Sequence, residues 1–352
     1  MSPAALASPS RPVSPWQLVY GGAHRLRAAW WRGRARRLPR PVVSVGNLHW
    51  GGAGKTPLVA AIAARLRDEG HRVCVLSRGY GGTGEGVRIV SDGGGPLLGP
   101  KVAGDEPVEL AGKLPGVAVV VDPDRHRAGL HALARLVPQP DLFLLDDGFS
   151  HLALARDLDL LAFPAADPFA GGRLAPAGRL REPLASVARA DAALLTGAPP
   201  GGEGRAAAEA LAAALRPHGL RGPAFAAESR TGAPALAGDR PLPADTPVLL
   251  VCGIARPGRF LAAARAGGRP VAGELVLPDH HDYPAATLER IRRAAEAAGA
   301  RAVLTTSKDR VKLHGRLDLP LAELPVEAAP EPAFWDWLAD RLAALTPAPE
   351  AR

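Results

Sequence analysis

The sequence predicts an α/β protein with a doubly wound parallel sheet that carries a P-loop, followed by a smaller C-terminal α/β domain. Three observations support this fold class. Short apolar runs alternate with helical patterns from residue 41 onward, as in parallel strands joined by crossover helices. A glycine-rich turn with lysine and threonine follows the first apolar run. At 352 residues the chain is too long for one comfortable core, so we expect two domains.

Residues 1–40 predict an amphipathic helix that lies on a membrane surface. Arginines lie roughly opposite apolar residues that recur at helical spacing, namely Trp16, Val19, Tyr20, Ala23, Leu26 and Trp30. The first 67 residues lack acidic side chains and carry a net charge of +11, against +8 for the whole chain. No run reaches the ~20 apolar residues of a spanning helix. We therefore expect an anionic membrane as partner and no nucleic acid, the alternatives being an ordinary packed helix or a transit-like segment.

The expected P-loop domain covers residues 41–222. Its expected strands are 41–45, 72–77, 117–121, 142–145, 158–163 and 192–196, and its expected helices are 57–69, 106–114, 125–136 and 205–215. Residues 223–246 are rich in proline, glycine and alanine, which predicts a linker. The alternation resumes over 247–352, where we expect strands at 248–252, 271–276 and 302–305 and helices at 259–264, 285–298 and 333–345.

The first turn of the P-loop domain predicts a site for a nucleoside triphosphate. The loop consists of Gly51, Gly52, Ala53, Gly54, Lys55 and Thr56. Backbone N–H groups of such a loop surround phosphate oxygens, the lysine reaches the β- and γ-phosphates, and the threonine hydroxyl ligates Mg²⁺. The usual pattern has a glycine six residues before the lysine, where this chain has His49. A glycine-rich turn that binds nothing is the alternative.

Acidic residues at a second strand end predict a metal site beside this loop. The apolar run 142–145 leads directly into Asp146 and Asp147. Adjacent carboxylates repel each other unless a cation or donors offset the repulsion, so a Mg²⁺ site explains them better than a solvated acid pair.

Other polar groups at expected turns offer a base for phosphoryl transfer. They lie around Asp105, around Asp279 and His280, and around Lys308. An aspartate and a histidine can share the removal of a proton from an acceptor hydroxyl. The alternatives are zinc binding by His280 and His281, and a helix cap formed by Asp279.

In these motifs the chain resembles the tetraacyldisaccharide 4'-kinases, which phosphorylate a lipid A precursor at the cytoplasmic face of the inner membrane of Gram-negative bacteria. The resemblance covers nearly the whole chain. Its motifs are Gly46-Asn47 before the loop, Ser77 to Gly81, Gly104 to Pro107, Asp124-Arg125 with Gly129, Asp146 to His151, Leu180 to Pro183, Gly253-Ile254 with Pro257 and Phe260, Asp279-His280, and Lys308-Asp309. Two positions depart from the family: Ser150 replaces the usual glutamine and Ser307 the usual glutamate.

The resemblance implies a kinase that uses ATP and Mg²⁺ to phosphorylate an acylated glucosamine disaccharide lipid. It implies that Asp105 and His280 form the dyad that deprotonates the sugar hydroxyl. The implied metal or network groups are Thr56, Asp146, Asp147, Glu106 and Glu182, and the implied substrate contacts are Arg78, Tyr80, Arg125 and His151. The family's loop also shares the missing glycine at position 49.

A P-loop switch without a phosphorylated product is the rival interpretation. Partitioning ATPases of that class usually have a lysine where this chain has Trp50, and guanine selection usually uses an Asn-Lys-x-Asp motif that residues 307–309 do not match. Dependence of ATP consumption on a lipid acceptor separates the two classes. We expect the protein to be a monomer.

Overall fold

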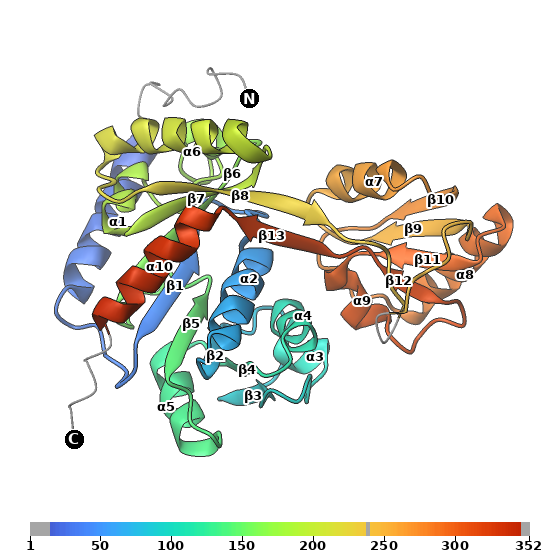
Figure 1. Cartoon of the computed structure of the whole chain (residues 1–352), viewed down its shortest axis with the longest axis horizontal. Coiled ribbons are helices and arrows are strands. Elements are labelled where there is room, and N and C mark those ends of the chain that lie inside the picture. The colour runs from blue at the N-terminus through green and yellow to red at the C-terminus, as the bar shows by residue number, and fades with distance from the viewer. Residues whose placement is uncertain (1–14, 237–239, 346–352) are drawn as a thin grey trace.

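A nine-stranded sheet forms the larger of two domains in the computed structural model, which describes residues 15–236 and 240–345. From one edge to the other, the strands are β13 (Val326–Pro330), β8 (Ala224–Thr231), β7 (Ala192–Ala198), β6 (Leu158–Pro164), β1 (Val42–Gly46), β5 (Leu142–Asp146), β2 (Val73–Ser77), β4 (Ala118–Val121) and β3 (Arg88–Ser91). Only the edge strands β13 and β3 run antiparallel to their neighbours. The large, mostly parallel sheet confirms the predicted α/β class (Figure 1).

Helices cover both faces of this sheet because its central strands are apolar on both sides. In β5, Leu142 and Leu144 pack toward the core that contains α2 (Lys55–Asp68), α4 (Asp105–Lys113) and α10 (Pro332–Leu345). Phe143 and Leu145 pack on the opposite side with α5 (Arg125–Arg135), and α6 (Gly201–Leu215) packs further along that face. The remaining helical segments of the larger domain are α1 (Pro15–Trp31), α3 (Pro100–Ala103), η2 (Ala170–Gly172), η3 (Leu184–Arg189) and η4 (Arg216–His218).

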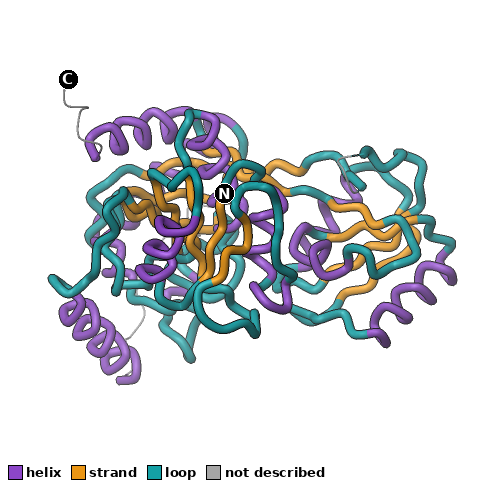
Figure 2. The backbone as a smooth tube through the Cα atoms, turned by 90° about the horizontal axis from the view of Figure 1, so that it is seen from below, coloured by secondary structure: helices purple, strands orange, loops and turns teal. Residues whose placement is uncertain are grey.

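The smaller domain has its own four-stranded parallel sheet, in the order β10-β9-β11-β12. Its elements are β9 (Val248–Cys252), α7 (Pro257–Ala266), β10 (Val271–Val276), α8 (Ala285–Ala298), β11 (Ala302–Thr305), α9 (Ser307–Leu313) and β12 (Leu321–Glu323). Figure 2 shows the strands gathered in two separate groups, one in each domain. The expected strands at 248–252, 271–276 and 302–305 are found with the same bounds.

The domain division differs from the expected one at both ends of the smaller domain. Residues 224–231, expected in a linker, form β8 of the large sheet, and β8 pairs with β13. The final helix α10, expected in the smaller domain, returns to the larger one (Figure 1). There the fully buried Phe334 packs edge-on against Phe225 of β8, with ring centroids 5.5 Å apart. The smaller domain therefore lies between β8 and β13 in the chain.

The fold brings the polar ends of several strands to one edge of the large sheet. The strands β1, β2 and β5 are parallel neighbours, so their carboxyl ends and the loops that follow lie together. The smaller domain approaches this edge through α9, which packs against α4. Within the described residues, the structure has no helix that is both long and apolar enough to cross a membrane.

Candidate active site

The glycine-rich loop between β1 and α2 has the backbone geometry of a phosphate site. Gly51 and Gly54 adopt left-handed φ angles of 100° and 70°, which favour glycine. A Cβ atom on Gly54 would also lie 3.2 Å from the Cβ of Thr196. Gly54, the residue before α2, has no side chain that could cap the helix, so the first backbone N–H groups of α2 can bind an anion. The loop can therefore receive phosphate oxygens at a helix N-terminus.

The side-chain amide of Asn47 holds Lys55 at this loop, and its hydrogen bonds fix which way the amide faces. The Nζ of Lys55 donates to Oδ1 of Asn47 at 3.0 Å. The Nδ2 group of Asn47 donates to the carbonyl oxygen of His49 at 2.9 Å and lies 3.0 Å from its Nδ1. Burial, with the nearby charges of Lys55 and Arg181, lowers the pKa of His49 to about 4. His49 is therefore a neutral, buried residue that orients Asn47.

Asp146 is a buried carboxyl group whose ionisation is unfavourable. It ends β5, and the hydroxyl of Ser77 donates to its Oδ2 at 3.1 Å. Burial raises the pKa of Asp146 to about 7, and the charges of Glu106 and Asp147 add to this effect. These contributions place Glu106 near the adjacent carboxyl groups of Asp146 and Asp147.

Asp147 has the opposite electrostatic environment. Burial acts to raise its pKa, but hydrogen bonds from Arg181 and the charge of Lys55 outweigh burial and hold the pKa well below its usual range. Arg181 donates to both carboxylate oxygens, with Nη1 2.8 Å from Oδ2. Lys55 Nζ lies 3.5 Å from Oδ1. Asp147 is therefore an ionised anchor for the two cations beside the loop.

The donor set fits Mg²⁺ that is shared with a nucleotide. Among the described residues, no three metal-ligating side chains are close enough to hold an ion by themselves. Mg²⁺ in nucleotide sites is commonly bound by one or two protein groups together with phosphate oxygens and water. The hydroxyl of Thr56 at the start of α2 and the carboxyl of Asp146 are suitable groups.

Glu182, the fifth predicted metal or network group, is held by Ser150, Arg189 and His24. It is fully buried and accepts from Ser150 at 2.6 Å and from Arg189 at 2.7 Å. His24 of α1 lies 4.0 Å away. This network joins α1 to the loops beside the site, and it gives Ser150 a partner that the sequence does not reveal.

The structure brings Asp105 and His280 together from different domains. Asp105 begins α4, and His280 lies in the turn after β10, where its φ of 59° is left-handed. The Nδ1 atom of His280 is 3.3 Å from Oδ2 of Asp105. The ring of Tyr80, a predicted substrate contact that is 69% exposed, stands edge-on to the imidazole at 5.9 Å.

The predicted contacts Arg125 and His151 also lie near the acidic groups. Arg125 is buried, and its Nε has no hydrogen-bond partner among the described residues. Burial lowers its pKa, while the charges of Asp146 and Asp147 oppose that shift and a nearby Arg78 adds to it. Burial and the charge of Arg125 lower the pKa of His151 to about 4. The arginines therefore supply positive charge beside the predicted phosphate site.

Sequence reasoning missed three partners of the site residues, namely Asn47, Arg181 and Lys312. Asn47 and Arg181 belong to motifs that were noted, but the motifs do not show which groups they contact. Lys312 Nζ is 2.6 Å from Oδ2 of Asp105. Lysine is rare in this chain, with five of 43 basic residues, and this scarcity is the one signal that could have drawn attention to it.

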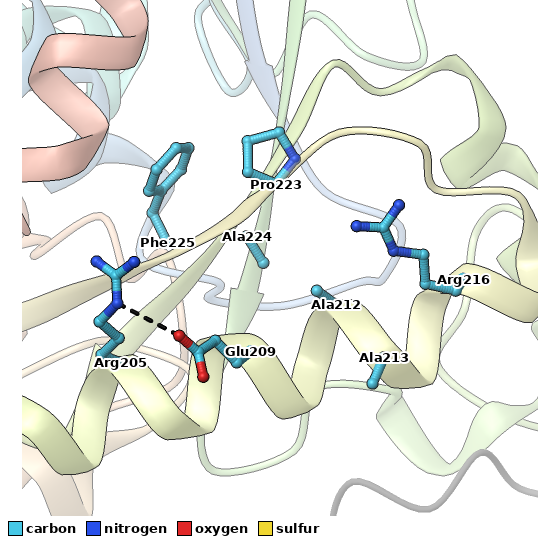
Figure 3. A pocket seen from close by; sticks show the side chains of 8 residues that line it. All are labelled: Arg205, Glu209, Ala212, Ala213, Arg216, Pro223, Ala224 and Phe225. Carbon is cyan, nitrogen blue, oxygen red and sulfur yellow. Dashed lines mark hydrogen bonds and ion pairs between the residues drawn. The ribbon is translucent and has the colours of Figure 1, made fainter.

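A separate groove of about 480 Å³ lies between α6 and β8. Figure 3 shows Arg205 and Glu209 of α6 turned toward each other at one end, with Phe225 of β8 above them. None of the predicted site residues lines this groove. The candidate active site lies instead at the P-loop edge of the large sheet, where Asp105 of α4 contacts His280 of the smaller domain.

Comparisons with known proteins find similar sequences and a similar structure. A family model described as tetraacyldisaccharide-1-P 4'-kinase matches residues 10–343. Tetraacyldisaccharide 4'-kinases of Pelobacter propionicus and Geobacter sulfurreducens are both 43% identical to the chain, covering 86% and 89% of it and 82% and 87% of their own lengths. A crystal structure of LpxK from Aquifex aeolicus in complex with ATP has a TM-score of 0.74 and 32% identity, covering 94% of this chain and 97% of that chain.

Proposed function

The chain belongs to the tetraacyldisaccharide 4'-kinase family, and from this premise we propose how its site works. The protein transfers the γ-phosphoryl group of ATP to the 4'-hydroxyl of a tetraacyldisaccharide 1-phosphate in lipid A biosynthesis. The single observation that carries the mechanism is the contact between Asp105 and His280 across the domain boundary, at the edge of the sheet that holds the P-loop. This contact and the family match favour a kinase over a P-loop switch.

The P-loop binds and orients the nucleotide. The open N–H groups at the start of α2 bind phosphate oxygens, and Lys55 neutralises the β- and γ-phosphates. Asn47 and Asp147 keep the lysine in place at 3.0 and 3.5 Å. Thr56 and Asp146 would hold Mg²⁺ together with the phosphates, and the ion would supply charge neutralisation there. Most of the rate acceleration then comes from positioning and electrostatics.

The acceptor hydroxyl loses its proton to the Asp105–His280 pair. Asp105 is largely shielded, with a side chain 15% exposed, and His280 is 38% exposed. A carboxylate hydrogen-bonded to an imidazole at the boundary can accept a proton as the hydroxyl attacks the phosphorus. Arg78, Tyr80, Arg125 and His151 remain proposed contacts to the phosphates or the disaccharide.

We further propose that α1 attaches the enzyme to the cytoplasmic face of the inner membrane. Several of its large apolar side chains are exposed, namely Leu18, Val19, Leu26 and Trp30. The helix also touches the site, because Tyr20 donates to the carbonyl oxygen of Arg181 and Arg27 to that of Ser150, each at 3.1 Å. The arrangement suits a lipid acceptor whose acyl chains stay in the bilayer while its sugar reaches the site.

The proposal is tested by assaying purified protein with Mg·ATP and the tetraacyldisaccharide acceptor. We expect lipid-dependent ATP consumption and a phosphorylated product. Asp105→Ala should abolish turnover and leave nucleotide affinity unchanged, because Asp105 acts on the acceptor and not on ATP. Asp68→Ala, at the exposed end of α2, is the matched control and should retain activity. Nucleotide binding by the wild type without lipid phosphorylation would refute the proposal.

A further inference from the structure

Helix α9 places two lysines of the smaller domain on the first turn of α4 in the larger domain. Lys308 and Lys312 are one helical turn apart and therefore share a face of α9. The side chain of Lys312 is 5% exposed, and its Nζ is 2.6 Å from Oδ2 of Asp105. The same ammonium donates to the carbonyl oxygen of His281 at 3.0 Å. A nearly buried charge thus connects the smaller domain to the proposed base.

Lys308 determines which nitrogen of the His280 imidazole carries the proton. Its Nζ lies 3.1 Å from Nε2 of His280 and 3.8 Å from Oε1 of Glu106. An ammonium group can only donate, so Nε2 accepts and the imidazole proton is on Nδ1. That Nδ1–H group then donates to Oδ2 of Asp105 at 3.3 Å. Both donors reach the same carboxylate oxygen, and within the described part of the chain Oδ1 receives no hydrogen bond.

We propose that Lys312 is a positioning residue for the phosphoryl transfer. Docking of α9 on α4 lets Lys312 and His280 fix Oδ2 of Asp105, which leaves Oδ1 as the atom that takes the proton of the acceptor hydroxyl. Without the ammonium, the carboxylate can rotate while the two domains remain in place. This inference rests on the proposed function, in which Asp105 belongs to the base. Displacing a reacting group by ~1 Å can lower a rate by about a hundredfold.

The variant Lys312→Met keeps the length and apolar stem of the side chain and removes its charge. We expect kcat to fall by about tenfold or more, while the KM for ATP and the affinity for nucleotide change by less than about twofold. Lys312→Arg should recover part of kcat because it restores a cationic donor.

Lys113→Met is the matched control for the loss of a lysine side chain at the contact between the domains. Lys113 ends α4, the helix against which α9 packs, and its Nζ lies 2.8 Å from Glu109 and 3.9 Å from Glu323 of β12 in the smaller domain, without a contact to Asp105 or His280. This variant should retain kcat. An equal loss of kcat in Lys113→Met would overturn the inference, because any weakening of the domain contact would then explain the effect.

Thermal unfolding provides a readout that does not use activity. If Lys312 binds Asp105 in solution, Lys312→Met should lower Tm less in an Asp105→Asn background than in the wild type. Additive shifts would show that the contact is absent and would overturn the inference. If Lys312→Met does not fold, Lys312→Gln retains a donor for the carbonyl of His281 and carries the same kinetic test.

The kinetic outcomes separate this inference from the proposed function. A wild type that binds nucleotide but does not phosphorylate the lipid refutes the function itself. An active wild type with an unchanged kcat in a folded Lys312 variant refutes only the positioning role. Parallel losses of kcat and nucleotide affinity would also refute it, because they would indicate general disorder of the site.

Discussion

Replacing Asp146 by Asn should stabilise the nucleotide-free protein at alkaline pH while it impairs catalysis. Asp146 is fully buried at the end of β5 and has the like charges of Glu106 and Asp147 close by. Its pKa is raised to about 7 in the folded protein, from 3.8 as its ordinary value. Between these values the folded state binds more protons than the unfolded state, so the stability of the wild type falls as the pH rises. Because asparagine cannot ionise, the stability of Asp146→Asn does not fall with pH for this reason.

The size of the effect follows from the two pKa values. A single carboxyl with this shift costs about 2 kcal/mol of folding free energy at about pH 5 and about 4 kcal/mol at about pH 8. Between these pH values, the stability of Asp146→Asn should therefore rise by about 2–3 kcal/mol relative to that of the wild type. The comparison between two pH values removes any constant effect of the substitution, such as a change in the hydrogen bond from Ser77.

Urea unfolding at the two pH values, with EDTA and without nucleotide, measures this difference. Asp245→Asn is the matched control, because Asp245 is an 83% exposed carboxyl on the smaller domain. The control should give a difference near zero. A difference below about 1 kcal/mol for Asp146→Asn would refute the reasoning, since the raised pKa would then not exist in the folded protein. Phosphorylation of the lipid by the variant at the wild-type rate would refute the proposed metal role of Asp146.

Two further predictions concern packing and membrane attachment. Gly46→Ala should lower the free energy of unfolding by about 1–3 kcal/mol, because the added Cβ would lie 2.4 Å from the Cβ of Phe149. Gly22→Ala, which meets nothing within 4 Å in helix α1, should not lower it, and equal urea midpoints for the two variants would contradict this reasoning. Leu26→Ser combined with Trp30→Ser should reduce cosedimentation with anionic phospholipid vesicles by about tenfold or more, since both exposed side chains lose apolar area. Val137→Ser, at a 96% exposed position after α5, should bind like the wild type, and unchanged binding of the α1 variant would exclude this helix as the anchor.

The central fold could be predicted because buried parallel strands have strong sequence patterns. Strands such as β5 and β9 are apolar on both faces, so each appears as an uninterrupted hydrophobic run between polar turns. The strands β8 and β13 lack such a run, because both combine alanine with polar and exposed positions. Their pairing depends on contacts between distant segments. The expected linker and the domain assignment of α10 therefore differ from the structure.

The parts of the site that are local in sequence could be predicted, and the contacts between distant segments could not. The P-loop and the acids after β5 are local motifs, and a strand, a turn and a helix suffice to place them. The contact of Lys312 with Asp105 depends on the docking of α9 against α4 and has no local pattern. Helix α9 itself has only seven residues, too few to show helical periodicity. The family resemblance named Asp105, His280 and Lys308, but it gave Lys308 no contact and did not include Lys312.

The site concentrates both backbone strain and unfavourable charge. Among the described residues, only four other than glycine have positive φ, and Asp147 and His280 are two of them. Such conformations cost about 1–3 kcal/mol each and persist where surrounding contacts fix them. Arg181 and Lys55 fix Asp147, and Asp105 and Lys308 fix His280. Together with the raised pKa of Asp146, this strain lowers the stability of the protein at this edge of the sheet. If the edge is the proposed site, substitutions that stabilise it should lower activity.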